Sequence, residues 1–476
     1  MRKIQQKKIL DLIVTVTDAQ EMGLYGDCQE CALQIGTYIE KLEGEGTKTV
    51  TLLEDYCEFL YQVSVGKADK HALQDALLEI KNSVDTELKP NKFKALFLPY
   101  YDNTWETMKS VYLEFASSKL FETEIVIIPI LRNTNVGDTL IWNDYLTPLG
   151  INNTHYDEYD IEDDSPDVVF YNQPYDGVNI PKFWSQNIRK HTGILIFIPY
   201  YMVPISTQGD SYEDNYTKLE SIQRCDIYIA QSEPFCEFYL RDASLHDKAL
   251  PVGNPKQDSL YAAKTHSDFT HYPDWEASIG NRRVILLNTH YSSMIDGVAA
   301  HHGVKRLIDH VFHDEDMFLI WRPHPTAFIM KMSAEMRVML DFVQAHERMV
   351  LDRSPSILPA YMYSNAVVSL FPSSIIMDAL FLDLPVFLLG REASAASSSS
   401  IPVYGAIAHE DYDFPLEDTE RGIFAPLDIF LQEIKNNEDS TREARGIFRA
   451  SEFPNQDGTV AKKILEHISN LLNGTE

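Results

Sequence analysis

Two polar motifs stand where predicted strands end in the second half of the chain. The hydrophobic run 318–321 leads into Arg322-Pro323-His324-Pro325, and a later strand is followed by Ser373-Ser374, which open a predicted helix containing Asp378. Ligands of parallel sheets bind outside the carboxyl ends of the strands, so both motifs are expected at one edge. A guanidinium, an imidazole and two hydroxyls at a helix N-terminus suit a phosphate or pyrophosphate.

Each of these side chains also has an ordinary structural alternative. Arg322 could pair with Asp352 or Asp378, and His324 could be a turn residue held between two prolines. Ser373 could serve only as an N-cap, the commonest role of serine at that position. Asp378 could anchor its own helix, so the functional interpretation depends on all four residues meeting at neighbouring strand ends.

The composition indicates a globular protein with an acidic surface. The 476 residues are 44% hydrophobic and 24% charged, with a formal net charge of −30. This charge argues against broad binding to nucleic acid or to anionic lipid. No signal peptide is expected, and no apolar run reaches the roughly 18 residues of a membrane span. Five cysteines, few and odd in number, favour a reducing, cytoplasmic location.

Residues 1–90 are expected to form a small helical domain. Apolar residues recur at helical spacing from Ile9 to Leu42, a break follows at 44–49, and a third helix is predicted over about 70–84. Cys28 and Cys31 fit ordinary positions on a helix face better than a redox pair or half a metal site. The domain could dock a partner, form a homo-oligomer, or pack on the body as an extension.

Buried strands alternating with helices begin near Lys94. Short apolar runs separated by helices predict parallel sheets covered on both faces. The pattern predicts two Rossmann-like domains, 91–265 and 275–455, with 261–280 as a linker and a C-terminal helix in 456–476. Two such domains in tandem form the GT-B arrangement, an α/β fold in which the domains face a cleft. The serine-rich run 393–400 could be a lid over that cleft or a plain connection.

The order of the motifs resembles that of the CDP-glycerol glycerophosphotransferases, which include the teichoic acid polymerases. In that family a strand ends in RPHP, and Ser-Ser-x-x-x-Asp opens a helix before an L-x-x-P strand, as at 322–325, 373–378 and 382–385 here. Residues 253–258 look like the family's G-x-P-R-N-D segment with Lys256 for arginine, and 288–290 stand where a strand ends in a turn. The resemblance covers roughly 94–390 and is strongest over 250–390.

The chain also departs from the family in two places. Tyr201 stands where the polymerases carry the histidine of a Trp-His-Gly-Thr-Pro turn, and Phe371 replaces the aspartate before the serine pair. The resemblance therefore supports nucleotide binding better than it identifies the base that deprotonates the acceptor. Asp102, Asp176 and His290 are candidates for that base. No acidic pair at a strand end predicts a metal site, and no cofactor is expected.

The resemblance implies transfer of glycerol phosphate, or a related alditol phosphate, from a CDP-alditol to a hydroxyl of a surface polymer or glycan precursor, with release of CMP. Phosphoryl transfer of this kind needs positioned, charge-neutralising donors. The expected catalytic residues are His324, Arg322, His290 and Asp102. The expected nucleotide and phosphate ligands are Arg322, Ser373, Ser374, Asp378, Gly253 and Asn288.

Tyrosine-rich loops after the strands of the first domain are expected to bind the acceptor, because aromatic faces with polar edges suit a polyol or sugar. The residues concerned are Tyr100, Trp105, Asn172 and Tyr201. Two rival functions stay open: a sugar-nucleotide GT-B glycosyltransferase or epimerase, and a non-catalytic GT-B-like protein that binds a nucleotide or polymer. A peripheral contact at the inner face of a membrane also stays open.

Overall fold

The computed structural model describes most of the chain. The described residues are 1–89, 92–134, 137–203, 216–240, 244–290, 294, 298–328, 331–370, 373–389, 403–406 and 425–474. The serine-rich run 393–400, considered above as a lid, lies outside them. Two compact units emerge: Met1–Leu98, Phe115–Tyr171 and Asp176–Ile196 form the first unit, and Pro99–Glu114, Asn172–Tyr175 and Phe197–Glu476 form the second.

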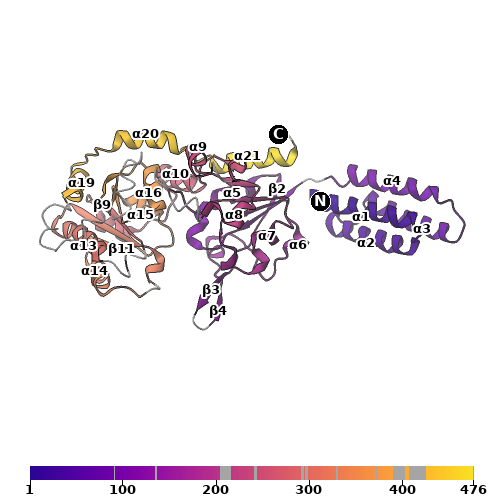
Figure 1. The fold of residues 1–476 in the computed structure, drawn as a ribbon, viewed down its shortest axis with the longest axis horizontal. Coiled ribbons are helices and arrows are strands. Elements are labelled where there is room, and N and C mark those ends of the chain that lie inside the picture. Colours follow the sequence, from indigo (N-terminus) through magenta and orange to yellow (C-terminus); the bar gives the residue numbers. More distant parts are fainter. Residues whose placement is uncertain are drawn as a thin grey trace. The chain divides into compact units, whose positions relative to one another are not determined.

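The first unit begins with four antiparallel helices that lie side by side (Figure 1): α1 (Lys3–Glu21), α2 (Tyr25–Glu43), α3 (Lys48–Ser64) and α4 (His71–Thr86). The region is helical as predicted, but the stretch from Ile9 to Leu42 is two helices rather than one. Gly23, with φ of +78°, forms the turn between them. At the predicted break, the Thr47 hydroxyl accepts a hydrogen bond from the Val50 N–H (3.3 Å) and caps α3.

A parallel sheet follows in the same unit. Its strands are adjacent in the order β2 (Phe121–Ile125), β1 (Phe93–Leu98), β5 (Val168–Tyr171) and β6 (Ile194–Phe197). Strand β2 ends at Ile125, before the apolar run 126–130 is complete. The chain then forms an antiparallel hairpin of β3 (Ile130–Thr134) and β4 (Gly137–Ile141), and the short helices α6 (Ile161–Asp164) and α7 (Ser185–Ile188) complete the unit.

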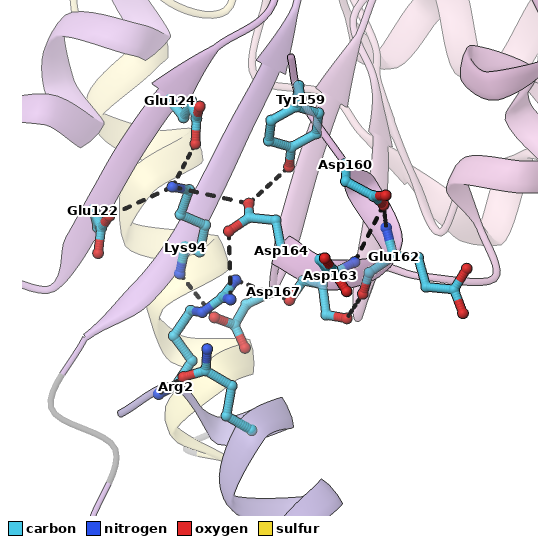
Figure 2. Close-up of polar contacts among 12 residues, drawn as sticks. Arg2, Lys94, Glu122, Glu124, Tyr159, Asp160, Glu162, Asp163, Asp164 and Asp167 are labelled. Atoms are coloured by element: carbon cyan, nitrogen blue, oxygen red, sulfur yellow. Dashed lines mark hydrogen bonds and ion pairs between the residues drawn. The ribbon is translucent and has the colours of Figure 1, made fainter. Parts of the chain in front are cut away.

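A buried ammonium group lies at the amino end of this sheet (Figure 2). The side chain of Lys94 is 9% exposed, and its Nζ lies 2.6 Å from Glu124, 3.4 Å from Glu122 and 3.8 Å from Asp164. Burial lowers the pKa of Lys94, but the hydrogen bond to Glu124 and the charge of Asp164 outweigh it, so the pKa is raised. A buried charge persists only with such partners.

The same cluster joins the first helix to the sheet. Arg2 donates to the Ser165 carbonyl (3.1 Å) and lies 3.4 Å from Asp164, which also accepts a hydrogen bond from the Tyr159 hydroxyl (2.7 Å). Asp164 therefore supplies a counter-charge to two cations, Arg2 and Lys94.

The second unit is built on a six-stranded parallel sheet. Its strands lie in the order β11 (Met349–Leu351), β10 (Met317–Pro323), β9 (Arg283–Thr289), β12 (Ala366–Ser369), β13 (Val386–Leu388) and β14 (Tyr404–Ala406). Alternate residues of each strand face opposite layers of helices. Ile285 and Leu287 pack with α13 (Val298–His313), α14 (Ala334–Ala345) and α19 (Ala425–Asn436). Val284 and Leu286 pack with α10 (Lys256–His266), α15 (Leu358–Tyr363), α16 (Ser374–Phe381) and α20 (Arg442–Glu452).

Several shorter elements precede this sheet in the chain. They are the 3₁₀ helix η1 (Asp102–Thr107), α5 (Lys109–Ser117), α8 (Glu220–Gln223), the parallel pair β7 (Ile227–Ile229) and β8 (Ala249–Leu250), and α9 (Glu233–Phe235). The prediction of a linker over 261–280 was wrong, because α10 and α11 (Pro273–Ile279) occupy most of it. Among the described residues, none of the helices has the length and apolarity needed to cross a membrane.

The C-terminal helix α21 (Val460–Asn473) is anchored by a buried carboxylate. Asp258 on α10 is 8% exposed and accepts hydrogen bonds from the Val460 (3.0 Å) and Ala461 (2.8 Å) N–H groups at the start of α21. A carboxylate at a helix N-terminus satisfies backbone donors and complements the helix dipole.

Asp258→Ala is expected to loosen α21, because the two N–H groups lose charge-assisted bonds that contribute about 1.5–3 kcal/mol each. Hydrogen exchange of residues 460–473 should accelerate, whereas Asp258→Asn, which keeps one acceptor, should have a smaller effect. Unchanged exchange in Asp258→Ala would show that packing alone holds the helix.

Candidate functional site

The carboxyl ends of β9 and β10 bring four predicted residues to one edge of the sheet. Arg322 and Asn288 are direct neighbours in the strand register, and the Asn288 side-chain amide donates to the Arg322 carbonyl (3.2 Å). The His324 N–H donates to the Thr289 carbonyl (2.9 Å), which continues the ladder past the end of the strand. These two hydrogen bonds hold the ends of β9 and β10 together, so His290 and His324 lie next to each other.

The two imidazoles form a pair. Their ring centroids are 5.9 Å apart, and both rings are half-buried. Burial lowers the pKa of His290, and burial together with the neighbouring His290 lowers the pKa of His324. The Thr326 N–H donates to Nδ1 of His324 (3.2 Å), so the proton of the neutral ring lies on Nε2. His324 thus carries an N–H donor at neutral pH.

Arg322 makes the first of its two alternative pairings. Its Nη1 donates to the Asp352 carboxylate (2.6 Å) and to the Ser354 hydroxyl (3.0 Å), and its Nη2 donates to the Ser354 carbonyl (2.9 Å). Asp352 is 1% exposed, so the ion pair is shielded from water. Both terminal nitrogens donate in these bonds, so Arg322 is held against Asp352 and Ser354, and its contact with a phosphate stays a prediction.

The serine pair opens helix α16, which follows β12. Ser373 occupies the N-cap position with an extended backbone, but its side chain makes no capping hydrogen bond. Its hydroxyl oxygen is buried without a partner in the described part of the chain. Ser374 is the first helical residue. A buried, unsatisfied hydroxyl beside free helix N–H groups is a place where an anion or a water can bind.

Asp378 on the same helix is fully buried and holds Lys256 rather than Arg322. Its Oδ2 accepts hydrogen bonds from the Lys256 ammonium and from the Tyr361 hydroxyl (2.9 Å), while its Oδ1 is buried without a partner in the described residues. Burial, followed by the charge of Asp378, raises the pKa of Tyr361, which keeps this hydroxyl protonated as a donor. Tyr361 was not among the predicted site residues, and Lys256 entered only through the resemblance.

Gly253 has a backbone role next to this group. Its φ of +100° lies in the left-handed region, and a Cβ there would lie 2.5 Å from the Gln257 amide oxygen and 3.2 Å from Val460. Its N–H donates to the Ala230 carbonyl (3.1 Å). The glycine therefore permits the turn that starts α10, which carries Lys256. Its predicted role in nucleotide binding stays a prediction.

The predicted acceptor tyrosines form an aromatic cluster in the second unit. Tyr100 lies 4.8 Å from Tyr101 and 6.2 Å from Tyr200, and Tyr201 lies 4.6 Å from Tyr200 and 5.5 Å from Tyr216, all between ring centroids. Burial raises the pKa of Tyr100 and Tyr200, so both hydroxyls stay protonated at neutral pH. Neutral hydroxyls can both donate to and accept from a polyol.

Two other residues predicted on the acceptor side, Asn172 and Trp105, mainly hold the loop around 102–107 in place. Asn172 is fully buried, and its amide nitrogen donates to the Thr104 carbonyl and the Thr107 hydroxyl, both at 3.3 Å. Trp105 is 2% exposed and packs on Tyr112, with ring centroids 5.8 Å apart. Asp102 is exposed and accepts a hydrogen bond from the Asn103 N–H (2.7 Å), so its role as a base stays a prediction.

Comparison with known proteins gives similarity of fold alone. No protein-family model matches the chain, and no curated protein sequence does. A solved structure from Listeria monocytogenes, assigned as a UDP-N-acetylglucosamine 2-epimerase, is 16% identical with a TM-score of 0.55, over 81% of this chain and 98% of that one. The UDP-GlcNAc 2-epimerase of Neisseria meningitidis, solved with UDP-GlcNAc, is 14% identical with a TM-score of 0.52, over 79% of this chain and 100% of that one.

A structure of the wall teichoic acid polymerase TagF also aligns, at 11% identity over 90% of this chain and 99% of that one. Its TM-score of 0.48 is too low to carry an argument. The chain therefore has an α/β fold of the GT-B type, with parallel sheets like those of the epimerases and a helical N-terminal region.

Proposed function

We propose that the protein is a GT-B enzyme that transfers an alditol phosphate from a CDP-alditol, with glycerol phosphate as the first candidate, to a hydroxyl of a surface polymer or glycan precursor. The observation that carries the proposal is the meeting of the RPHP and Ser-Ser-x-x-x-Asp motifs at one sheet edge. There His324 offers an Nε2–H donor, and Ser373 has a buried hydroxyl without a partner in the described residues, at a helix N-terminus.

In the proposed reaction, the acceptor oxygen attacks the β-phosphorus of the donor and the bond from this phosphorus to the bridging oxygen breaks. CMP leaves with the electron pair of that bond, and the acceptor hydroxyl loses its proton to a base. His324 stabilises the charge that develops on the leaving phosphate, and the N-terminus of α16 binds the phosphate oxygens. His290 is the nearest candidate base, because it lies beside His324 and burial keeps it neutral.

The direct test is release of CMP from CDP-glycerol in the presence of polyol and glycan acceptors. Release that depends on an acceptor supports the proposal. Tight binding of CDP-glycerol without release, with every acceptor tried, would favour a non-catalytic binding protein instead. Tyr201 stands where the polymerases carry a histidine, and this replacement is the feature that favours a non-catalytic binding protein.

A sugar-nucleotide enzyme is the second candidate, because the fold is similar to that of UDP-GlcNAc 2-epimerases with TM-scores above 0.5. The two candidates differ in the nucleotide they bind. If UDP-GlcNAc raises the melting temperature of the protein and CDP-glycerol does not, the alditol-phosphate proposal is wrong. The reverse result excludes the epimerase-like alternative.

Proton uptake should accompany binding of the nucleotide diphosphate. The pKa values of His290 and His324 lie below the ordinary value of 6.5 in the free protein, and an anion beside the rings raises them. Affinity should therefore increase as the pH falls from about 8 to about 6. Calorimetry at pH 6.5 in two buffers of different ionisation enthalpy should show net uptake, and the double variant His290→Gln/His324→Gln should abolish it. Net proton release would contradict this assignment.

A further inference from the structure

Two of the cations near the carboxyl edge of the second sheet are already neutralised. Arg322 is bound to Asp352, and Lys256 is bound to Asp378. Both carboxylates are almost fully buried, so neither cation can leave its partner without exposing an unpaired charge to a poorly solvated environment. A substrate with several phosphate charges needs a further cation at this edge.

Arg353 has the geometry for that role. It is the second residue after β11, it is exposed, and its guanidinium carbon lies 4.3 Å from the centroid of the Phe328 ring. Within the described residues no carboxylate pairs with it. A guanidinium stacked on a ring keeps its N–H donors in its own plane, where they can form bidentate bonds with a phosphate. Phe328 thus orients the guanidinium while leaving its charge available.

Arg322 fixes the turn that carries Arg353. Its hydrogen bonds go to Asp352 and Ser354, the two residues that flank Arg353. The Ser354 N–H donates to the Asp352 carboxylate (2.8 Å), and the Asp352 N–H donates to the Trp321 carbonyl (2.8 Å), so the turn is held from both sides. Arg322 therefore holds the turn in place, while Arg353, between the two residues that Arg322 binds, is exposed.

The strand order places Arg353 at one end of a row of candidate site residues along the carboxyl edge of the second sheet. The strands β11, β10, β9 and β12 are neighbours, and Arg353, His324, His290 and Ser373 follow them in that order. Neighbouring strands are about 4.8 Å apart, so the strands bearing Arg353 and Ser373 are separated by three spacings, roughly 14 Å. A phosphate bound at the N-terminus of α16 therefore leaves room for the histidines and then Arg353 to meet groups farther along the substrate.

We propose that Arg353 binds an anionic phosphate group of the substrate, on the side of the histidine pair away from α16, and that Arg322 is a positioning residue for Arg353. This inference rests on the proposed function, because it takes the substrate to be phosphorylated. The phosphate belongs either to the donor, as its β-phosphate, or to a phosphorylated acceptor.

The test compares Arg353→Ala with Arg337→Ala, a matched exposed arginine on α14. Calorimetry with CMP, CDP, CDP-glycerol and inorganic pyrophosphate is run on both variants at two salt concentrations. A donor contact predicts that Arg353→Ala weakens CDP and pyrophosphate binding about 10-fold or more, with a smaller salt dependence and little change for CMP. An acceptor contact predicts unchanged donor binding and a KM about 10-fold higher for a phosphorylated acceptor but not for a neutral polyol. If Arg353→Ala matches Arg337→Ala in every assay, the inference is wrong.

Arg322→Lys tests the positioning role. Lysine keeps the charge but loses the two hydrogen bonds to Ser354, so the variant should lose affinity for the phosphorylated ligand as Arg353→Ala does. The double variant should bind this ligand no more weakly than Arg353→Ala alone. Additive losses would mean that Arg322 contacts the phosphate itself.

The proposed function can fail separately. If the wild-type protein binds neither CDP-glycerol nor UDP-GlcNAc, the proposed function fails. Binding of inorganic pyrophosphate then tests the inference about Arg353. Pyrophosphate binding that Arg353→Ala loses and Arg337→Ala keeps would sustain it. Equal binding by both variants, or none by the wild type, would overturn it.

Discussion

His324→Ala is expected to reduce the rate of CMP release by about 10²–10⁴-fold, the range that a positioned acid–base group contributes. The Nε2–H of the neutral ring is lost, and with it the donor that stabilises the leaving phosphate. Binding of CDP-glycerol should change far less, because the N-terminus of α16 remains. CMP release under single-turnover conditions and calorimetric binding separate the two effects.

Two further variants sharpen this prediction. His324→Gln places an amide N–H near the position of Nε2, so it should recover most of the rate if the ring only donates a hydrogen bond. It should be as slow as His324→Ala if the ring transfers a proton. His313→Ala, on the exposed end of α13, is the matched control and should behave as the wild type. Wild-type CMP release in His324→Ala would remove His324 from the mechanism.

Lys256→Met is expected to destabilise the second unit by about 3–5 kcal/mol, because it leaves the fully buried Asp378 without its cation. The thermal midpoint of this unit should fall, and protease sensitivity around α16 should rise. The double variant Lys256→Met/Asp378→Asn removes both charges and should regain much of the loss. This cycle isolates the pair, because methionine preserves most of the volume of lysine.

Lys305→Met is a matched control for this experiment. Lys305 also pairs with an aspartate, Asp309 (2.6 Å), but both side chains are exposed, at 65% and 44%. Exposed pairs contribute about 0–1 kcal/mol, so this variant should remain close to the wild type. If Lys256→Met were as stable as Lys305→Met, the buried pair would not be important for stability.

The strands of the second sheet could be predicted because the residues that define each strand are adjacent in the sequence. A central parallel strand is buried on both faces, so β9 and β10 appear in the sequence as continuous apolar runs that end in polar residues. That pattern also located Arg322, His324 and Ser373, because each stands near the end of such a run. The placement of these residues at strand ends required no knowledge of distant contacts.

The missed features depend on contacts between distant residues or on buried polar groups. Lys256 and Asp378 are 122 positions apart, and no periodicity links them. The last part of helix α10, residues 261–266, was taken for a linker because the segment that begins there shows no apolar residues at helical spacing. Helix α11 did carry a signal, since Pro273 stands at its first position, where proline favours helix initiation.

The cluster around Lys94 affects how a shortened chain would behave. In the whole protein, Arg2 and Lys94 stand among four carboxylates, those of Glu122, Glu124, Asp164 and Asp167. Deleting the helical region would remove Arg2 and leave one cation facing all four. Loss of function in such a shortened chain would thus be ambiguous evidence for a docking role of the helical region, because the sheet region itself would carry an uncompensated negative charge. Arg2, the N-cap residue of the first helix, is in this sense an electrostatic part of the sheet region that it contacts.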